Sequence, residues 1–213
     1  MMSGTQRSRP NDRIAITGMG VISPIGQGVE AFWSSLVHGV SGITDIARFP
    51  TQDFRVRRGG EVKPWHGTLG TTRPLPACRA SQFLIYAATE ALSMARLHDV
   101  AVPVGGLGVV IGSALGGMAE AERWQEQPTD LQALAGASYD GPTRHLAAWL
   151  GAAGPVLTLS TACASGATTL GLGADLLRAG AATAVIAGGV DVLSRFVMRG
   201  FNHLRALTRD EIR

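Results

Sequence analysis

The feature that most constrains the fold is a series of short apolar segments that end in glycine or other small residues. Four of them are candidate buried strands: 13–20, 107–111, 156–159 and 184–187. Apolar runs of this length, bounded by turn residues, are typical of strands that are covered on both faces. Longer segments separate them, so the pattern predicts parallel βαβ units and a layered α/β fold with a mostly parallel central sheet.

The intervening segments carry helical signals. Apolar residues at helical spacing predict helices over 29–37, 81–97 and 144–150. A further helix is expected to follow 161–166 and to end near Arg178. Its residues are small or apolar on nearly every side, which predicts a helix buried on several sides. Segment 49–66 is expected to form a surface hairpin or loop, and 119–139 to be partly helical.

Length and composition favour one domain. A chain of 213 residues with 46% hydrophobic and 16% charged residues is long enough to bury a core and is not typical of disordered proteins. No linker divides it. We expect the polar residues 1–12 to form a flexible tail and residues 13–213 to form the domain.

The charge pattern bears on partners. The net charge is +3, and only Arg55, Arg57 and Arg58 form a tight basic cluster. A nucleic-acid-binding protein is expected to carry a denser basic face with interleaved aromatic residues, so we expect no nucleic-acid partner. A modest attraction to an acidic protein is compatible with this charge.

The uncharged runs 100–119 and 146–174 are interrupted by glycine and proline. These breaks favour buried strands and turns over a membrane span. The first residues contain no apolar signal core, and the two cysteines lack a CxxC spacing. We therefore expect no membrane association and a cytoplasmic location.

Cys163 is the candidate nucleophile. It lies between a predicted buried strand and a predicted helix, and a thiol at a helix N-terminus is favoured as thiolate. Backbone N–H groups at the same turn could stabilise the oxyanion of an attacked thioester. The position alone also fits a small buried hydrophobic residue, so both interpretations stay open at this point. Cys78, which lies in a proline-flanked segment, is expected to be structural.

No cofactor or metal site is expected. The turn with Gly18 and Gly20 lacks the third glycine of a dinucleotide site, and segment 112–117 lacks the Lys-Ser/Thr of a P-loop. The five histidines have no metal-ligand spacing, and each is expected at the surface or at a helix end. Asp191 is expected to be a turn or capping acid.

The segment Thr161-Ala-Cys-Ala-Ser-Gly166 resembles the corresponding motif of the β-ketoacyl synthases, the condensing enzymes of fatty-acid and polyketide synthesis. Further segments resemble the same family in the same order. They are 13–26, 29–33, 41–43, 60–62, 108–117, 187–191 and 200–207. Such an ordered series is far more specific than any single motif, and it favours the catalytic interpretation of Cys163.

The resemblance implies a thiolase-like fold, in which two βαβαβαββ halves pack back to back, usually in a homodimer. It implies that Cys163 accepts an acyl group from acyl carrier protein. Decarboxylation of malonyl carrier protein then provides the carbanion that attacks this acyl group. By the same comparison Leu115 lines the acyl pocket, and no cofactor takes part.

The chain departs from the family in one respect. The two catalytic histidines, the lysine and the Gly-Phe-Gly segment belong to the family's second half and have no counterpart here. Segment 208–213 also reads like the interior of a protein. We expect an N-terminal half that is incomplete alone, so that the rest of the protein or a partner synthase chain completes the site.

Two alternatives stay open: a catalytically silent fragment or partner subunit, and a thiolase-like transferase that acts on coenzyme A. The retained Cys163 argues against a chain-length partner, because those subunits typically lack the nucleophile.

Overall fold

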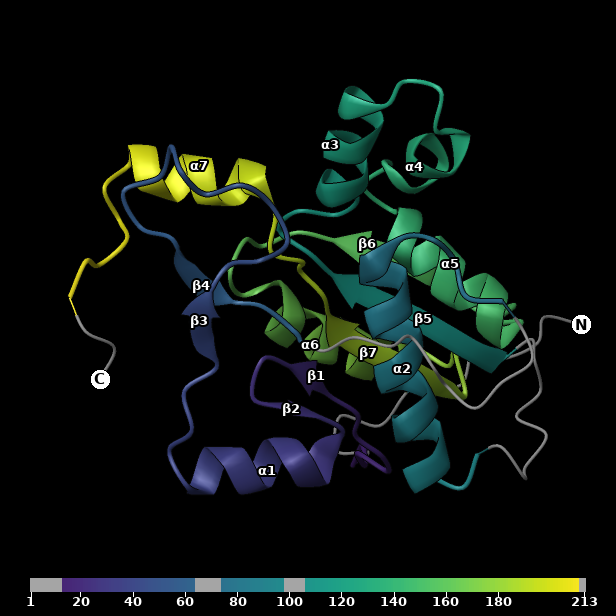
Figure 1. Ribbon diagram of the computed structural model, residues 1–213. Helices are drawn as coiled ribbons and strands as arrows, with labels where there is room; N and C mark the ends of the chain where they lie inside the picture. The colour runs from purple at the N-terminus through teal and green to yellow at the C-terminus, as the bar shows by residue number, and fades with distance from the viewer. Residues whose placement is uncertain (1–12, 64–73, 98–105, 211–213) are drawn as a thin grey trace, which may run out of the picture.

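The computed structural model describes residues 13–63, 74–97 and 106–210. The expected flexible tail, 1–12, lies outside these residues. Figure 1 shows a central sheet with helices on both sides, and smaller peripheral elements around it.

The centre is a parallel three-stranded sheet in the order β6-β5-β7. The strands are β5 (Leu107–Gly112), β6 (Val156–Leu159) and β7 (Ala184–Gly189). Every residue of β5 is buried, because a strand flanks it on each edge and helices cover both faces. The three corresponding sequence predictions are confirmed, and β7 also includes the two glycines that were expected to close it.

Helices α2 (Arg79–Met94) and α5 (Gly141–Leu150) cover one face of the sheet. Their side chains form the main core cluster with alternate residues of β5. The cluster contains Leu84, Ile85, Ala88, Val109, Ile111, Leu146 and Ala147. Both helices begin or end within a few residues of the predicted bounds.

Helix α6 (Ser165–Arg178) packs on the opposite face, against β5 and β7. Thr169 and Gly173 are buried there, and a Cβ added at Gly173 would contact Val185 at 3.2 Å. The far side of the helix is open, with Leu170 52% exposed. The predicted burial on several sides therefore holds for the sheet-facing side alone.

The peripheral elements confirm several expectations. Helix α1 (Val29–Val37) has the predicted bounds. Strand β4 (Arg58–Gly60) lies in segment 49–66, which was expected to be a hairpin or loop, and pairs with β3 (Ile43–Asp45), which precedes that segment. Strands β1 (Ile22–Ser23) and β2 (Gly26–Gln27) form a short second hairpin. Segment 119–139 is helical in part, as α3 (Met118–Glu126) and α4 (Leu131–Gly136).

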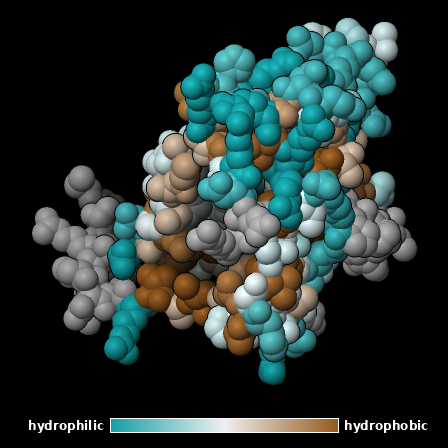
Figure 2. All heavy atoms as spheres, turned by 60° about the vertical axis from the view of Figure 1, so that its left-hand side comes forward, coloured by the Kyte–Doolittle hydropathy of each residue, from teal (hydrophilic) through white to brown (hydrophobic). Residues whose placement is uncertain are grey.

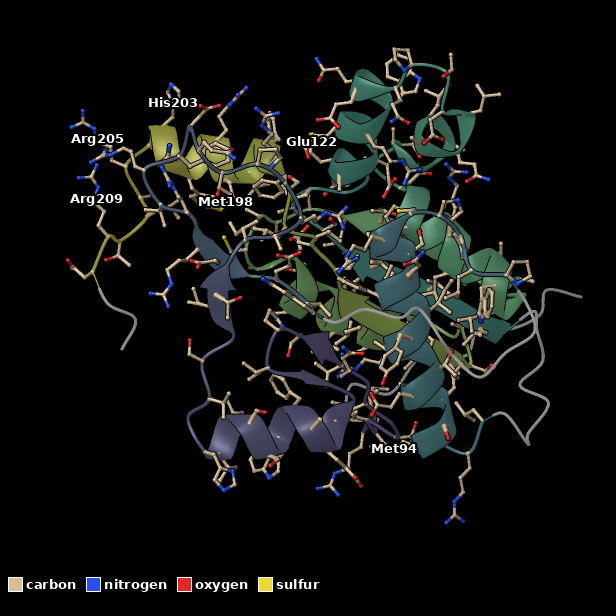
Figure 3. The ribbon with its side chains drawn as sticks, in the orientation of Figure 1. Met94, Glu122, Met198, His203, Arg205 and Arg209 are labelled. Carbon is tan, nitrogen blue, oxygen red and sulfur yellow. The ribbon has the colours of Figure 1, made fainter. Side chains whose placement is uncertain are left out.

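Helix α7 (Arg195–His203) is attached to the domain at its N-terminus, through the buried Met198, and through Asn202, whose side-chain oxygen accepts a hydrogen bond from the Arg55 N–H (3.2 Å). Glu122 of α3 accepts hydrogen bonds from the first backbone N–H groups of α7, those of Arg195 (3.2 Å) and Phe196. Figure 3 shows Glu122 beside this end of the helix. Met198 packs into a small cluster with Ile46 and Phe54.

The predicted buried strand at 13–20 is wrong. No residue of this segment belongs to a strand, and Ile16 is 74% exposed. The segment instead lies against α2, where a Cβ at Gly20 would meet the Ala87 carbonyl oxygen at 1.8 Å. An apolar run becomes a strand only when a neighbouring strand completes its hydrogen bonds, and the described residues offer it none.

Within the described ranges, no helix is both long and apolar enough to cross a membrane. No group of histidine, cysteine, aspartate and glutamate side chains suited to a metal ion occurs among these residues.

Candidate active site

The three central strands all end at one edge of the sheet, because they run parallel. The turn after β5 carries Leu115, the turn after β6 carries Cys163, and the turn after β7 carries Asp191. Ligands of open α/β sheets bind at the carboxyl ends of the strands. The topology thus brings both predicted site residues to the edge where a functional site is expected.

Cys163 is exposed and lies two residues before the first residue of α6. The residue before it, Ala162, has a φ of 52°, in the left-handed region that residues other than glycine seldom occupy. Strain of this kind is concentrated at functional sites, where surrounding contacts maintain it. The Cys163 thiol makes no hydrogen bond with another residue that the structure describes.

Ser165 holds this turn closed. Its hydroxyl accepts a hydrogen bond from the backbone N–H of Thr161 (2.9 Å) and donates to the carbonyl oxygen of Ala162 (2.6 Å). The Ser165 side chain is buried, so solvent does not compete for these bonds. Thr161 is fixed further by a hydrogen bond between its hydroxyl and that of Thr168 (2.8 Å).

Glycines let the start of α6 rest directly on the strand ends. A Cβ at Gly112 would meet the carbonyl oxygen of Ser165 at 2.4 Å, and one at Gly189 would meet the Cα of Gly166 at 3.0 Å. Because no side chain intervenes, the helix N-terminus and Cys163 lie immediately above the sheet edge.

Asp191 anchors the neighbouring turn. Its carboxylate accepts hydrogen bonds from the Ser113 hydroxyl (2.7 Å) and from the backbone N–H groups of Ala114 and Leu115 (both 3.0 Å). The expectation of a turn acid is confirmed. Sequence reasoning missed which turn it holds, although the pairing of β5 with β7 would have placed residues 113 and 191 side by side.

A cavity of about 240 Å³ lies between segment 20–24, helix α2 and segment 189–193. Asp191 contributes to its lining, but neither Cys163 nor Leu115 does. We therefore place the candidate site at the Cys163 turn and not in this cavity. Leu115, which is half-buried, also lies outside the cavity.

Two of the described histidines, His145 and His38, form hydrogen bonds with other residues. His145 is half-buried, with its Nδ1 atom 2.8 Å from the Ser81 hydroxyl, and this burial departs from the expected surface location. His38 is exposed and contacts the Ser34 carbonyl oxygen. His66 and His98 lie outside the described residues. Cys78 is 2% exposed within an apolar cluster, which fits the structural role expected of it.

These features define a three-layer α/β protein that presents an accessible cysteine on a strained turn at the carboxyl edge of a parallel sheet. A family profile described as "Beta-ketoacyl synthase, N-terminal domain" matches residues 11–213. The chain belongs to this family, and the resemblance seen in its sequence is confirmed.

Curated relatives carry the name 3-oxoacyl-[acyl-carrier-protein] synthase 2. The protein of Staphylococcus aureus (strain COL) is 33% identical over 213 residues, which cover 95% of this chain and 51% of the relative. That of Synechocystis sp. (strain ATCC 27184 / PCC 6803 / Kazusa) is 32% identical and covers 92% of this chain and 50% of the relative. The chain thus spans about half the length of the curated relatives it matches.

Two solved structures of ketosynthases have a similar fold. A structure titled "The ishigamide ketosynthase/chain length factor" superposes with a TM-score of 0.84 at 29% identity, covering 92% of this chain and 51% of that one. A second structure, a type II polyketide synthase acyl-carrier protein in complex with its ketosynthase, gives a TM-score of 0.77 at 25% identity, covering 92% and 50%. The predicted thiolase-like α/β fold is confirmed.

Proposed function

We propose that this chain is the nucleophile-bearing half of a β-ketoacyl-acyl-carrier-protein synthase, and that Cys163 accepts the acyl group. The observation that carries this proposal is the exposed Cys163 on the strained turn that begins α6, in a chain 33% identical to a 3-oxoacyl-[acyl-carrier-protein] synthase 2.

The exposed position of Cys163 supports the first step. The Cys163 thiolate attacks the carbonyl carbon of a carrier-bound thioester, and the negative charge moves to the carbonyl oxygen. A backbone N–H of the turn, which we assign to Cys163, stabilises that oxyanion. The tetrahedral intermediate then collapses, the bond to the carrier sulfur breaks, and the carrier thiolate leaves and takes up a proton.

The second step joins the acyl group to a carbanion formed when malonyl carrier protein loses carbon dioxide. Stabilising that carbanion needs general acid and electrostatic groups. None of the histidines described here contacts Cys163, and by family resemblance these groups belong to the second half. We therefore infer that condensation requires that half, present in the same protein or in a partner synthase chain of a homodimer or heterodimer.

We further propose that Leu115 lines the acyl pocket, that acyl carrier protein is the partner that delivers the substrate, and that the protein acts in the cytoplasm. The position of Leu115 beside the Cys163 turn, at the same sheet edge, supports the first of these. The names of its relatives, which refer to acyl carrier protein, support the second.

The test is covalent labelling of the purified chain with cerulenin, a cysteine-directed acyl mimic, followed by peptide mapping. Cys163 is exposed and Cys78 is buried, so we expect the label on Cys163. A Cys163→Ser variant should lose the label and a Cys78→Ser variant should keep it. Equal labelling of both cysteines, or labelling of Cys78 alone, would contradict the proposal.

A further inference from the structure

The 113–116 turn, which carries Leu115, is held by partners from three other parts of the chain. Asp191 follows β7 and binds the turn from one side. The Ser113 carbonyl oxygen accepts a hydrogen bond from Tyr139 and also lies 3.4 Å from the Ser165 hydroxyl, which shares its one proton with the nearer Ala162 carbonyl oxygen (2.6 Å). Ser165 is the residue that closes the Cys163 turn, so one hydroxyl connects the two turns.

Within the turn, residues 114 and 115 depend most on Asp191. The Ser113 hydroxyl accepts hydrogen bonds from the N–H groups of Leu115 (3.1 Å) and Gly116 (2.6 Å). Gly116 packs directly against Tyr139, because a Cβ there would meet Tyr139 atoms at 2.7 Å. The Leu115 carbonyl oxygen accepts a hydrogen bond from the Met118 N–H (3.1 Å), so the Asp191 carboxylate fixes this segment from its N–H side.

A carboxylate suits this position because both of its oxygens face donors. One oxygen accepts from Ser113, Ala114 and Leu115, and the other lies 3.2 Å from the Ala114 nitrogen. Hydrogen bonds to an ionised acceptor are about twice as strong as neutral ones. An asparagine amide in the same place would point its NH₂ group, which is a donor, at a backbone N–H donor in either orientation, so one hydrogen bond would be lost.

We propose that Asp191 is a positioning residue for acyl-chain selectivity, which acts by fixing Leu115 relative to Cys163. This inference rests on the proposed function, since it assumes that an acyl chain extends past Leu115 from Cys163. It adds a determinant that does not itself contact the acyl chain.

The experiment uses the purified 213-residue chain and a series of N-alkyl iodoacetamides from methyl to dodecyl. The rate of Cys163 alkylation is measured by peptide mass analysis for each reagent. If the alkyl chain binds along Leu115, longer reagents react faster than the methyl reagent. One lost apolar contact changes discrimination by roughly tenfold, so we expect Asp191→Asn to reduce the long-to-short rate ratio by about that factor. The methyl rate, which reports the thiol itself, should not change.

Asp175→Asn is the matched control. It makes the same isosteric loss of charge on an exposed residue of α6, which pairs with Arg178 at 3.2 Å. Its rate ratio should equal that of the wild type. Asp191→Glu, which keeps the carboxylate, should restore part of the ratio. If Asp191→Asn does not fold, Ser113→Ala provides the decision, because it removes the hydroxyl that donates to Asp191 and accepts from the N–H groups of Leu115 and Gly116.

The outcomes separate the two proposals. A wild-type chain that prefers long reagents, together with an Asp191→Asn variant that keeps the same preference, overturns the role of Asp191 alone. A change in the methyl rate equal to that in the long-chain rates also overturns it, because the variant then alters the thiol and not the selectivity. Absence of Cys163 labelling in the wild type overturns the proposed function, and the role of Asp191 with it.

Discussion

Ala162 carries the backbone strain of the candidate site. A left-handed conformation costs a residue with a Cβ about 1–2 kcal/mol, whereas glycine adopts it freely and instead loses about 0.5–1 kcal/mol of chain entropy on folding. We therefore expect Ala162→Gly to raise the free energy of unfolding by about 0.5–1 kcal/mol. The measurement is urea denaturation.

Ala174→Gly, in the interior of α6, is the control for this prediction, because a helical residue has an ordinary negative φ. There glycine relieves no strain, so the variant should lose about 0.5–1 kcal/mol. If the two variants destabilise the protein equally, the left-handed turn is not a source of strain.

The His145 side chain contributes to the pH dependence of the free energy of unfolding. Burial lowers its pKa, and the charge of Arg144 lowers it further, while Glu120 acts in the opposite direction. In the unfolded chain the pKa is about 6.5. Below that pH the unfolded state takes up a proton that the folded state resists, so this residue lowers stability as the pH falls from about 6.5 through the folded pKa.

Replacing His145 with glutamine should therefore flatten the stability curve on the acid side of about pH 6.5. Urea denaturation at a series of pH values measures the effect against the wild type. His38→Gln, at an exposed position, is the control. A His145→Gln curve parallel to that of the wild type would show that burial of His145 has no effect on stability.

At the scale of elements, the contact between α6 and the strand ends depends on Gly112. A methyl group there would overlap the Ser165 carbonyl, which is backbone and cannot rotate away. Overpacking of this kind costs about 1–3 kcal/mol, so we expect Gly112→Ala to lower the free energy of unfolding by that amount. The displaced α6 start should also change the iodoacetamide reaction rate of Cys163.

Gly171→Ala provides the matched substitution in α6 itself. A Cβ at Gly171 meets nothing within 4 Å, so alanine there should stabilise the helix by about 0.5–1 kcal/mol. The two variants are therefore expected to change the melting temperature in opposite directions. A Gly112→Ala variant as stable as the wild type would mean that α6 does not rest on the sheet as described.

Elements specified by local sequence were predictable, and those specified by distant neighbours were not. Helix α1 and strand β6 have the predicted bounds, because spacing and adjacent glycines are local signals. Segment 13–20 has an equally clear apolar pattern, but strand formation depends on a partner. Likewise the position of Cys163 between a strand and a helix could be predicted from local sequence, whereas the hydrogen bonds that Asp191 accepts from the Leu115 turn exist only because β5 and β7 are neighbours.

Across the molecule, many large hydrophobic side chains of the described residues are exposed to solvent. Ile16 is 74% exposed and Leu204 is 76% exposed, and the open side of α6 adds Leu170. Figure 2 shows hydrophobic side chains gathered in the lower part of one face, below a hydrophilic region. Surface of this kind favours contact with another polypeptide, so we expect the purified chain to associate in a concentration-dependent manner, as measured by analytical ultracentrifugation.

The 213-residue chain alone should acquire an acyl group without extending it. Acyl transfer needs the Cys163 side chain and the turn around it, and both are present. Decarboxylation of a malonyl unit also needs acid–base groups next to the acyl-cysteine, and each such group typically contributes roughly 10²–10⁴-fold. The described histidines that form hydrogen bonds do so elsewhere, His145 with Ser81 and His38 with Ser34.

Incubation with acyl and malonyl carrier protein should therefore give an acyl adduct by mass spectrometry, absent from Cys163→Ser, and no ketoacyl product. Robust ketoacyl product from a monodisperse preparation would show that residues of this chain supply those groups themselves, and would contradict the inferred need for a second half.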